Sequence, residues 1–305
     1  MNAGRWSGIA LRAVDELVDT IVLVFLLLLI AFACYAMWDS DQVHRAAGFK
    51  RYEIYKPTTD DSISFEEFRL VNPEVFSWLT VYGTNIDYPV TQAEDNERYV
   101  NTNAFGQYSL SGSIFLDADN DKSFRDFNSI MYGHHMEKEV MFGELSLFDE
   151  KQYFDDRPHG NLFFDGKDHG LEFFAFIRTT AYDRMLFTAG VQDKASQQEY
   201  LQMLWDNASH TRDIEVSIAD NILLLTTCSS YTTNGREILV ARITDETYPN
   251  TFLADDGEER SVAAIGEQSG EQTCLLTLAI PLLLILISAA IYYWTQGDGK
   301  GKGAA

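Results

Sequence analysis

Cysteine is scarce in this chain. Only three of its 305 residues are cysteines, and two of them, Cys34 and Cys274, lie in or beside long apolar runs. The polar part of the chain between those runs keeps only Cys228, so no disulfide can form within it. A thiol left without a second cysteine to pair with is a candidate reactive group.

Basic residues are also few. The chain has 23 Lys and Arg against 46 Asp and Glu, which gives a formal net charge of −23 at pH 7. A surface of this sign repels the phosphates of nucleic acids and the head groups of anionic lipids, so we expect neither as a partner. The charge would suit a cationic substrate, and simple solubilisation explains it equally well.

Metal-ligand spacings are missing as well. The sequence contains no Cys-x-x-Cys and no His-x-x-x-His, so we expect no zinc site. The acidic run at 117–121 resembles half of a calcium loop, but it lacks the downstream glycine and bidentate glutamate of an EF-hand. We interpret this run as a solvated turn, and we predict neither a metal nor another cofactor.

Two uncharged apolar runs, residues 20–38 and 275–294, stand out against this polar background. Each is close to the about 20 residues that cross a bilayer as a helix. Basic residues lie outside both runs, at Arg5, Arg12, Lys300 and Lys302. By the positive-inside rule we predict a cell-membrane protein with two spans, cytoplasmic termini and residues 39–274 outside the cell.

The first apolar run has a second interpretation. Ala31-Phe-Ala33 resembles a signal-peptidase site, which would release the chain from this run. We favour an uncleaved anchor because the run continues through Tyr35 and Trp38, whose rings suit a membrane interface.

The outside segment has a mainly β pattern. Short strand-like runs alternate with turns, at 76–82, 86–90, 112–116, 129–132, 162–164, 171–178, 214–218, 222–227 and 237–243. Frequent short strands predict a barrel or a sandwich. Two helices are expected, a short one at 64–70 that Ser64 would cap and an amphipathic one at 196–209.

Cys228 closes a buried-type strand at 221–228, and Arg236 opens the next strand, at 236–243. Asn234-Gly235 between them is a strong hairpin signal. The hairpin would bring the thiol close to a permanent cation, which lowers a thiol's pKa and stabilises an oxyanion. This arrangement is typical of a nucleophile.

A cysteine nucleophile needs an imidazole nearby. His134 and His135 follow an apolar strand that Gly133 closes. Neighbouring strand residues point to opposite faces, so only one of the two can meet Cys228. We interpret the other histidines, His44, His159, His169 and His210, as solvated.

Most of residues 40–243 resembles the class B sortases. The similar stretches lie in order at 72–79 ("NPDVVGWI"), 83–90 ("GTNIDYPV"), 95–100 ("DNxxYL"), 112–117 ("GSIFLD"), 131–143 ("YGHHM…MFG") and 225–228 ("LSTC"), with Arg236 at the expected distance. Each stretch is weak alone, and the ordered set is specific.

The resemblance implies a closed eight-stranded β-barrel with an N-terminal helical extension and a helix between two late strands. The implied domains are a cytoplasmic N-terminus (1–19), a transmembrane helix (20–38), the extension (39–71), the barrel (72–243), an acidic tether (244–274), a second transmembrane helix (275–294) and a cytoplasmic tail (295–305).

The resemblance also implies an activity. Sortases are cysteine transpeptidases that cleave a threonine-containing C-terminal sorting signal of a secreted protein and transfer the acyl group through a thioester to an amine. By position, the implied catalytic residues are Cys228, His134 and Arg236. Asn96, Tyr132 and Thr226 match positions that bind the substrate.

The second predicted span departs from the simplest class B layout and resembles that of pilus-building sortases. The resemblance to pilus-building sortases also implies an N-terminal lid over the active site, but Asp60-Asp61 lies in the helical extension and not in an obvious lid. We therefore expect secreted proteins with a sorting signal as donors and peptidoglycan, or its precursor, as acceptor, with a pilin amine as the alternative. A secreted cysteine endopeptidase would share the Cys–His pair, and a non-catalytic receptor would have no need of Cys228.

Overall fold

The structure is a computed structural model that describes residues 3–58, 63–136, 139–228 and 234–253. The chain divides into two compact units. One consists of Met1–Asp41 with Ala254–Ala305, and the other is Gln42–Leu253. The second unit holds every candidate site residue.

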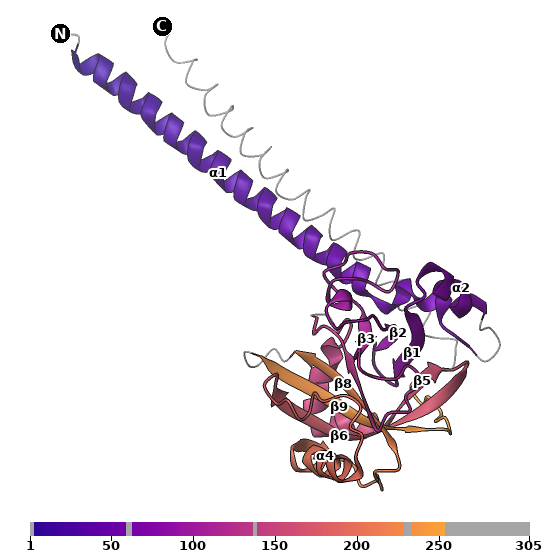
Figure 1. Cartoon of the computed structure of the whole chain (residues 1–305). Coiled ribbons are helices and arrows are strands. Elements are labelled where there is room, and N and C mark those ends of the chain that lie inside the picture. The colour runs from indigo at the N-terminus through magenta and orange to yellow at the C-terminus, as the bar shows by residue number, and fades with distance from the viewer. Residues whose placement is uncertain (1–2, 59–62, 137–138, 229–233, 254–305) are drawn as a thin grey trace. The chain divides into compact units, whose positions relative to one another are not determined.

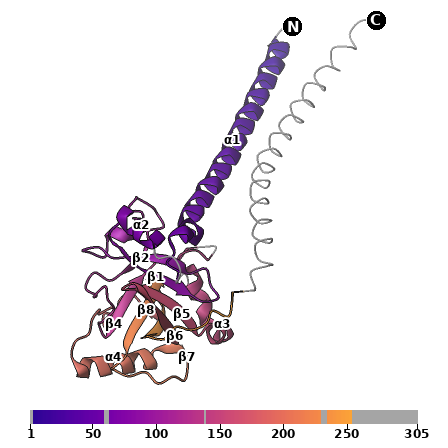
Figure 2. The same ribbon diagram turned by 90° about the vertical axis from the view of Figure 1, so that its right-hand side faces the viewer.

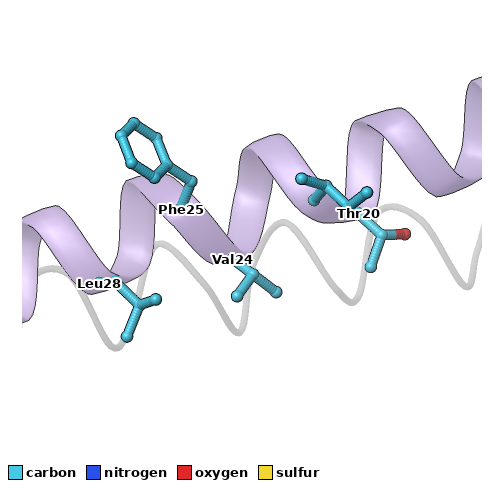
Figure 3. Close-up of a pocket in the computed structure, with 5 residues that line it drawn as sticks. Thr20, Val24, Phe25 and Leu28 are labelled. Atoms are coloured by element: carbon cyan, nitrogen blue, oxygen red, sulfur yellow. The ribbon is translucent and has the colours of Figure 1, made fainter.

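The long helix α1 (Ala3–Ala47) carries the first apolar run. Its stretch Leu17–Arg45 is long and apolar enough to cross a membrane, and an 18-residue window within this stretch has a mean hydropathy of 2.9. A membrane anchor and a signal sequence both fit this helix. A shallow hollow on its surface is lined by Thr20, Ile21, Val24, Phe25 and Leu28, and Figure 3 shows apolar side chains there. Such a surface suits lipid contact. The predicted second span, 275–294, lies outside the described residues.

The N-terminal extension folds onto the barrel through aromatic rings. It contains the 3-10 helices η1 (Phe49–Arg51) and η2 (Glu53–Tyr55) and the helix α2 (Ile63–Val71). Tyr52 stacks on Phe68 and Phe105, with ring centroids 6.0 and 5.2 Å apart. The predicted short helix is confirmed, but Ser64 is not its cap, because α2 begins one residue earlier.

Nine strands are formed by the described residues. They are β1 (Val75–Val81), β2 (Asp87–Thr91), β3 (Ile114–Leu116), β4 (Asn128–Tyr132), β5 (His159–Phe164), β6 (Lys167–Thr180), β7 (Ala208–Thr211), β8 (Asn221–Cys228) and β9 (Gly235–Thr244). Their order is β5-β1-β2-β3-β4-β8-β9-β6-β7, and β5 also pairs with β6. That pairing closes a ring of eight strands, with β7 attached outside it. The eight-stranded barrel is therefore confirmed.

The alternation of side chains along β8 separates two apolar cores. Leu223 and Leu225 belong to the larger core, whereas Ile222 and Leu224 belong to a smaller core under the helix α4 (Lys194–Asp206). Both faces of β8 are buried, which explains its nearly continuous apolar sequence. Figures 1 and 2 both show α4 along one side of the barrel.

Helix α4 is shorter than predicted. The Asp193 side chain accepts a hydrogen bond from the Ser196 backbone and caps its start, while Asn207 ends it and β7 follows at once. The predicted strand at 214–218 is wrong. Ile214, Val216 and Ile218 pack against the smaller core, but the described residues provide no strand that pairs with this segment.

The start of the predicted tether packs against the barrel. The Tyr248 ring stacks on His159 at 3.8 Å, and the Tyr82 hydroxyl donates to the Tyr248 carbonyl at 3.1 Å. The Arg157 guanidinium lies 5.2 Å from the Phe252 ring. The predicted start of the tether at residue 244 is therefore wrong, because residues 244–253 belong to the barrel unit, and the rest of the predicted tether lies outside the described residues.

Three short helices complete the barrel domain. They are η3 (Arg98–Val100), η4 (Gly143–Asp149) and α3 (Lys151–Asp156). η3 precedes β3, and η4 and α3 fill the connection from β4 to β5. The loop between β4 and η4 carries both candidate histidines.

Candidate functional site

The hairpin of β8 and β9 places two candidate residues opposite each other. In its antiparallel register, Cys228 is the partner of Arg236, and Thr226 is the partner of Ile238. Asn234, just before β9, has a φ of 60°, a left-handed conformation that asparagine tolerates in turns. The hairpin predicted from Asn-Gly is confirmed, and the backbones of Cys228 and Arg236 are neighbours.

β4 pairs with β8 on the side opposite β9 and runs parallel to it. Tyr132, the last residue of β4, pairs with Thr226, and the Gly133 backbone donates to the Thr226 carbonyl at 3.2 Å. His134 comes two residues after Tyr132, just as Cys228 comes two residues after Thr226. The paired register ends at Tyr132 and Thr226, so His134 and Cys228 each lie two positions beyond the last paired residue of their segment.

His134 is held by the main chain. Its Nε2 lies 2.8 Å from the carbonyl oxygen of Val100 at the end of η3. Because a carbonyl only accepts hydrogen bonds, Nε2 carries a proton. Nδ1 is therefore the ring nitrogen that can take up or release a proton. The His134 carbonyl accepts from the Phe142 backbone at 3.1 Å. These two bonds fix both the ring and the loop that carries it.

His135 has a different environment. Its Nδ1 lies 4.0 Å from Oε2 of Glu237, whose side chain is fully buried. Glu237 pairs with Thr227 in the β8–β9 ladder, so it alternates with Arg236 along β9. The two neighbouring histidines thus contact different parts of the fold, His134 the end of η3 and His135 a residue of β9.

Asn96 and Tyr132 meet at Asp117. The Asn96 amide nitrogen and the Tyr132 hydroxyl each lie 2.9 Å from Oδ2 of Asp117. Only 5% of Asp117 is exposed. The interpretation of 117–121 as a solvated turn is therefore wrong at its first residue, which sequence reasoning also missed as a site residue.

The pKa of Tyr132 responds to its burial and to charged side chains of the candidate site. Burial, followed by the Asp117 carboxylate, raises the pKa of Tyr132 well above its usual range, and the positive charge of Arg236 lowers that pKa slightly. A phenol with this balance stays protonated at physiological pH, so its hydrogen is available to Asp117. Tyr132, Asp117 and Arg236 therefore share one electrostatic environment.

Thr226 and Arg236 differ in exposure. Thr226 is 1% exposed, and its hydroxyl has no hydrogen-bond partner among the described residues. Arg236 is partly exposed, and its Nη1 donates to the Gly235 carbonyl at 3.0 Å. Arg242, further along β9, instead binds the Glu172 carboxylate and the Glu215 carbonyl. Arg236 is thus the arginine placed beside the end of β8.

Glu144, the second residue of η4, binds the turn between β1 and β2. Its carboxylate accepts hydrogen bonds from the backbone and side chain of Asn85. Burial, with a further contribution from Glu139, raises the pKa of Glu144 to about 7, although the Asn85 backbone bond lowers it. Folding therefore favours the protonated form of the Glu144 carboxyl over its ionised form.

We expect the free energy of unfolding to fall as pH rises from about 4.5 to about 7, by about 2–3 kcal/mol from Glu144 alone. The contribution is complete below the unfolded pKa and is lost as Glu144 ionises through its raised folded pKa. Glu144→Gln stays neutral, so its advantage over the wild type should grow across this range. Urea unfolding of the purified protein at several pH values measures the difference.

The matched control is Glu199→Gln on the exposed face of α4. Its stability relative to the wild type should not depend on pH. A constant difference for Glu144→Gln from pH 4.5 to 8 would contradict the raised pKa.

Among the described residues, no three or more His, Cys, Asp or Glu side chains are grouped to hold a metal ion. A second shallow hollow lies along α4, between Met185 and Asn207. It contains none of the candidate residues.

Comparison with known proteins gives relatives of one kind. No family model matches the chain. Sortase B of Listeria monocytogenes is 30% identical over 164 residues, which cover 54% of this chain and 66% of the relative, just under two thirds of its length.

Among the similar solved structures, two pilus-related sortases are covered by this chain over nearly their whole length. Sortase B from the type II pilus of Streptococcus pneumoniae is 45% identical, with a TM-score of 0.53, over 60% of this chain and 99% of that chain. A class B sortase of Streptococcus pyogenes involved in pilus biogenesis is 36% identical, with a TM-score of 0.55, over 59% of this chain and 98% of that chain.

Proposed function

Because this chain belongs to the class B sortases, a family of cysteine transpeptidases, we propose that it joins secreted proteins to an amine at the cell surface. The donor carries a threonine-containing C-terminal sorting signal, and the acceptor is an amine of cell-wall peptidoglycan or its precursor. The main support is the register of three neighbouring strands. Cys228 is level with Arg236 on one side, and Tyr132 is level with Thr226 on the other.

The first half of the proposed reaction forms a thioester. The Cys228 thiolate attacks the carbonyl carbon of the signal's threonine, and the carbonyl oxygen becomes an oxyanion. Arg236 is always charged and presents a planar fork of donors, which suits that oxyanion. When the C–N bond breaks, the leaving amine takes a proton from His134.

The Val100 carbonyl supports this proton transfer. It holds Nε2–H of His134, so the proton that moves is the one on Nδ1. The carbonyl dipole also stabilises the imidazolium, as an acceptor on the second ring nitrogen does in other histidine sites. In the second half, the acceptor amine attacks the thioester, its proton returns to His134, and the thiolate leaves.

Pilin polymerisation is the second candidate function. Two of the similar structures come from sortases described with pili, one from a type II pilus and one involved in pilus biogenesis. The donor chemistry would be the same, and the acceptor would be a lysine side chain of the next pilin. Only the acceptor separates the two proposals.

Incubation with a threonine-centred peptide library tests the transfer. The purified protein should convert a library member to an amide product when triglycine, a mimic of a cell-wall amine, is present. A preference for a lysine-bearing peptide over triglycine would instead favour pilin assembly. Mass spectrometry distinguishes these products from the free acid. Release of the free acid alone, at a rate that no amine changes, would indicate a hydrolase and contradict the proposal.

A further inference from the structure

Asp117 links the two candidate substrate-binding side chains without being one of them. It directly follows β3 and lies close to the last residue of β4. One oxygen of its carboxylate, Oδ2, receives both the Asn96 amide and the Tyr132 hydroxyl at 2.9 Å. The other oxygen, Oδ1, receives the Asp119 backbone N–H at 3.0 Å. Three donors thus converge on one buried carboxylate.

This arrangement fixes the orientation of the Asn96 side-chain amide. The Asn96 side-chain oxygen accepts from the Ala118 backbone at 2.8 Å, while its nitrogen donates to Asp117. An amide with both ends bound in this way cannot flip. The Tyr132 hydroxyl donates to the Asp117 carboxylate, and its oxygen keeps its lone pairs for another partner.

Asp117 is itself held rigidly. Its backbone N–H donates to the Ile130 carbonyl at 2.9 Å, and its carbonyl accepts from the buried Gln92 side chain at 2.6 Å. The Gln92 nitrogen also binds the Asn120 carbonyl at 2.8 Å. The carboxylate therefore stands on a main chain that is fixed on both sides.

We propose that Asp117 is a positioning residue that sets the orientation of Asn96 and Tyr132 for binding the sorting signal. This inference rests on the proposed function. Asp117 contacts neither the reacting atoms nor the substrate in this scheme, and it acts through the two side chains that bind its Oδ2. Its loss should therefore weaken binding of the peptide more than it slows the chemical step.

The test is Asp117→Asn, which keeps the shape but replaces one acceptor oxygen by a donor nitrogen. At least one of the three converging donors then loses its acceptor. We expect KM for the sorting peptide to rise about tenfold to a hundredfold, the range for hydrogen bonds to a charged group. We expect kcat to stay within about threefold, because uniform binding affects KM alone.

Asp119→Asn is the matched control. It makes the same chemical change two residues away, on an exposed side chain, and should leave KM unchanged. In a background with Asn96→Ala and Tyr132→Phe, Asp117→Asn should raise KM no further, because the residues it positions are gone. An equal rise in that background, or a fall in kcat together with Tm at unchanged KM, would overturn the inference.

A second measurement does not depend on activity. The Asn96 side-chain amide, identified in NMR spectra of asparagine-labelled protein by its loss in Asn96→Ala, should shift in Asp117→Asn and not in Asp119→Asn. If the wild type and Asp119→Asn transfer no peptide, the proposed function fails, and this signal still decides the positioning. An unshifted Asn96 amide would refute the positioning even if transfer is observed.

Discussion

Replacing Cys228 by alanine is expected to abolish both cleavage of the sorting peptide and its transfer to an amine. The reaction needs a covalent thioester, so the loss should reach a factor on the order of 10⁴ or more. Mass spectrometry of the wild type with a good donor peptide and no added amine should reveal the acyl-enzyme, and the variant should lack it. The Tm should change little, because the substitution removes one sulfur atom at the end of β8.

The matched control for this variant is Cys34→Ala. Cys34 lies in the apolar stretch of α1, so this substitution removes a thiol that is outside the barrel unit. Transfer should continue at the wild-type rate. A folded Cys228→Ala protein that still transfers peptide would refute the proposed nucleophile and the mechanism built on it.

Replacing His134 by alanine is expected to lower the transfer rate by about 10²–10⁴, the usual contribution of a proton-transfer group. The reason is chemical, since the proposed reaction then has no acid to protonate the leaving amine. The kcat of both the cleavage and transfer steps, measured with saturating peptide, should fall together. The loss should exceed any change in Tm.

His135 provides an internal comparison for the same experiment. His135→Asn keeps a hydrogen-bond donor beside the buried Glu237 carboxylate, so we expect nearly wild-type kcat. His135→Ala removes the imidazole beside that buried carboxylate, so the variant should have a lower Tm. Its activity per folded molecule should stay close to that of the wild type. Normal activity in His134→Ala and a large loss in both His135 variants would reverse the assignment.

The parts of the fold that could be predicted are those that short-range patterns determine. The alternation in β8 and β9, the Asn234-Gly235 turn and the amphipathic stripe of α4 all depend on residues a few positions apart. Periodicity alone could not predict where α4 ends, because Ala208 continues the apolar stripe of the helix. The structure ends the helix at Asp206, and pairing with β6 takes Ala208 into β7 instead.

The site was predictable to the extent that it lies on strand ends. Cys228, Arg236 and His134 follow or open strongly patterned strands. Asp117 looked solvated because its neighbours in sequence are polar, and its burial depends on contacts with Asn96 and Tyr132, which lie 21 and 15 positions away. Glu144 was missed for the same reason, since Asn85 lies 59 positions away.

The parallel pairing of β4 with β8 has a consequence for how the enzyme comes into existence. These strands lie more than ninety residues apart in sequence and are joined only when the ring of strands forms. Contacts of such high sequence separation form late, because chain entropy must be lost before they are gained. In a partly folded chain the segments that carry Cys228 and His134 are therefore not yet held together. The proposed chemistry of Cys228 and His134 would accordingly be assembled only after β8 has joined β4.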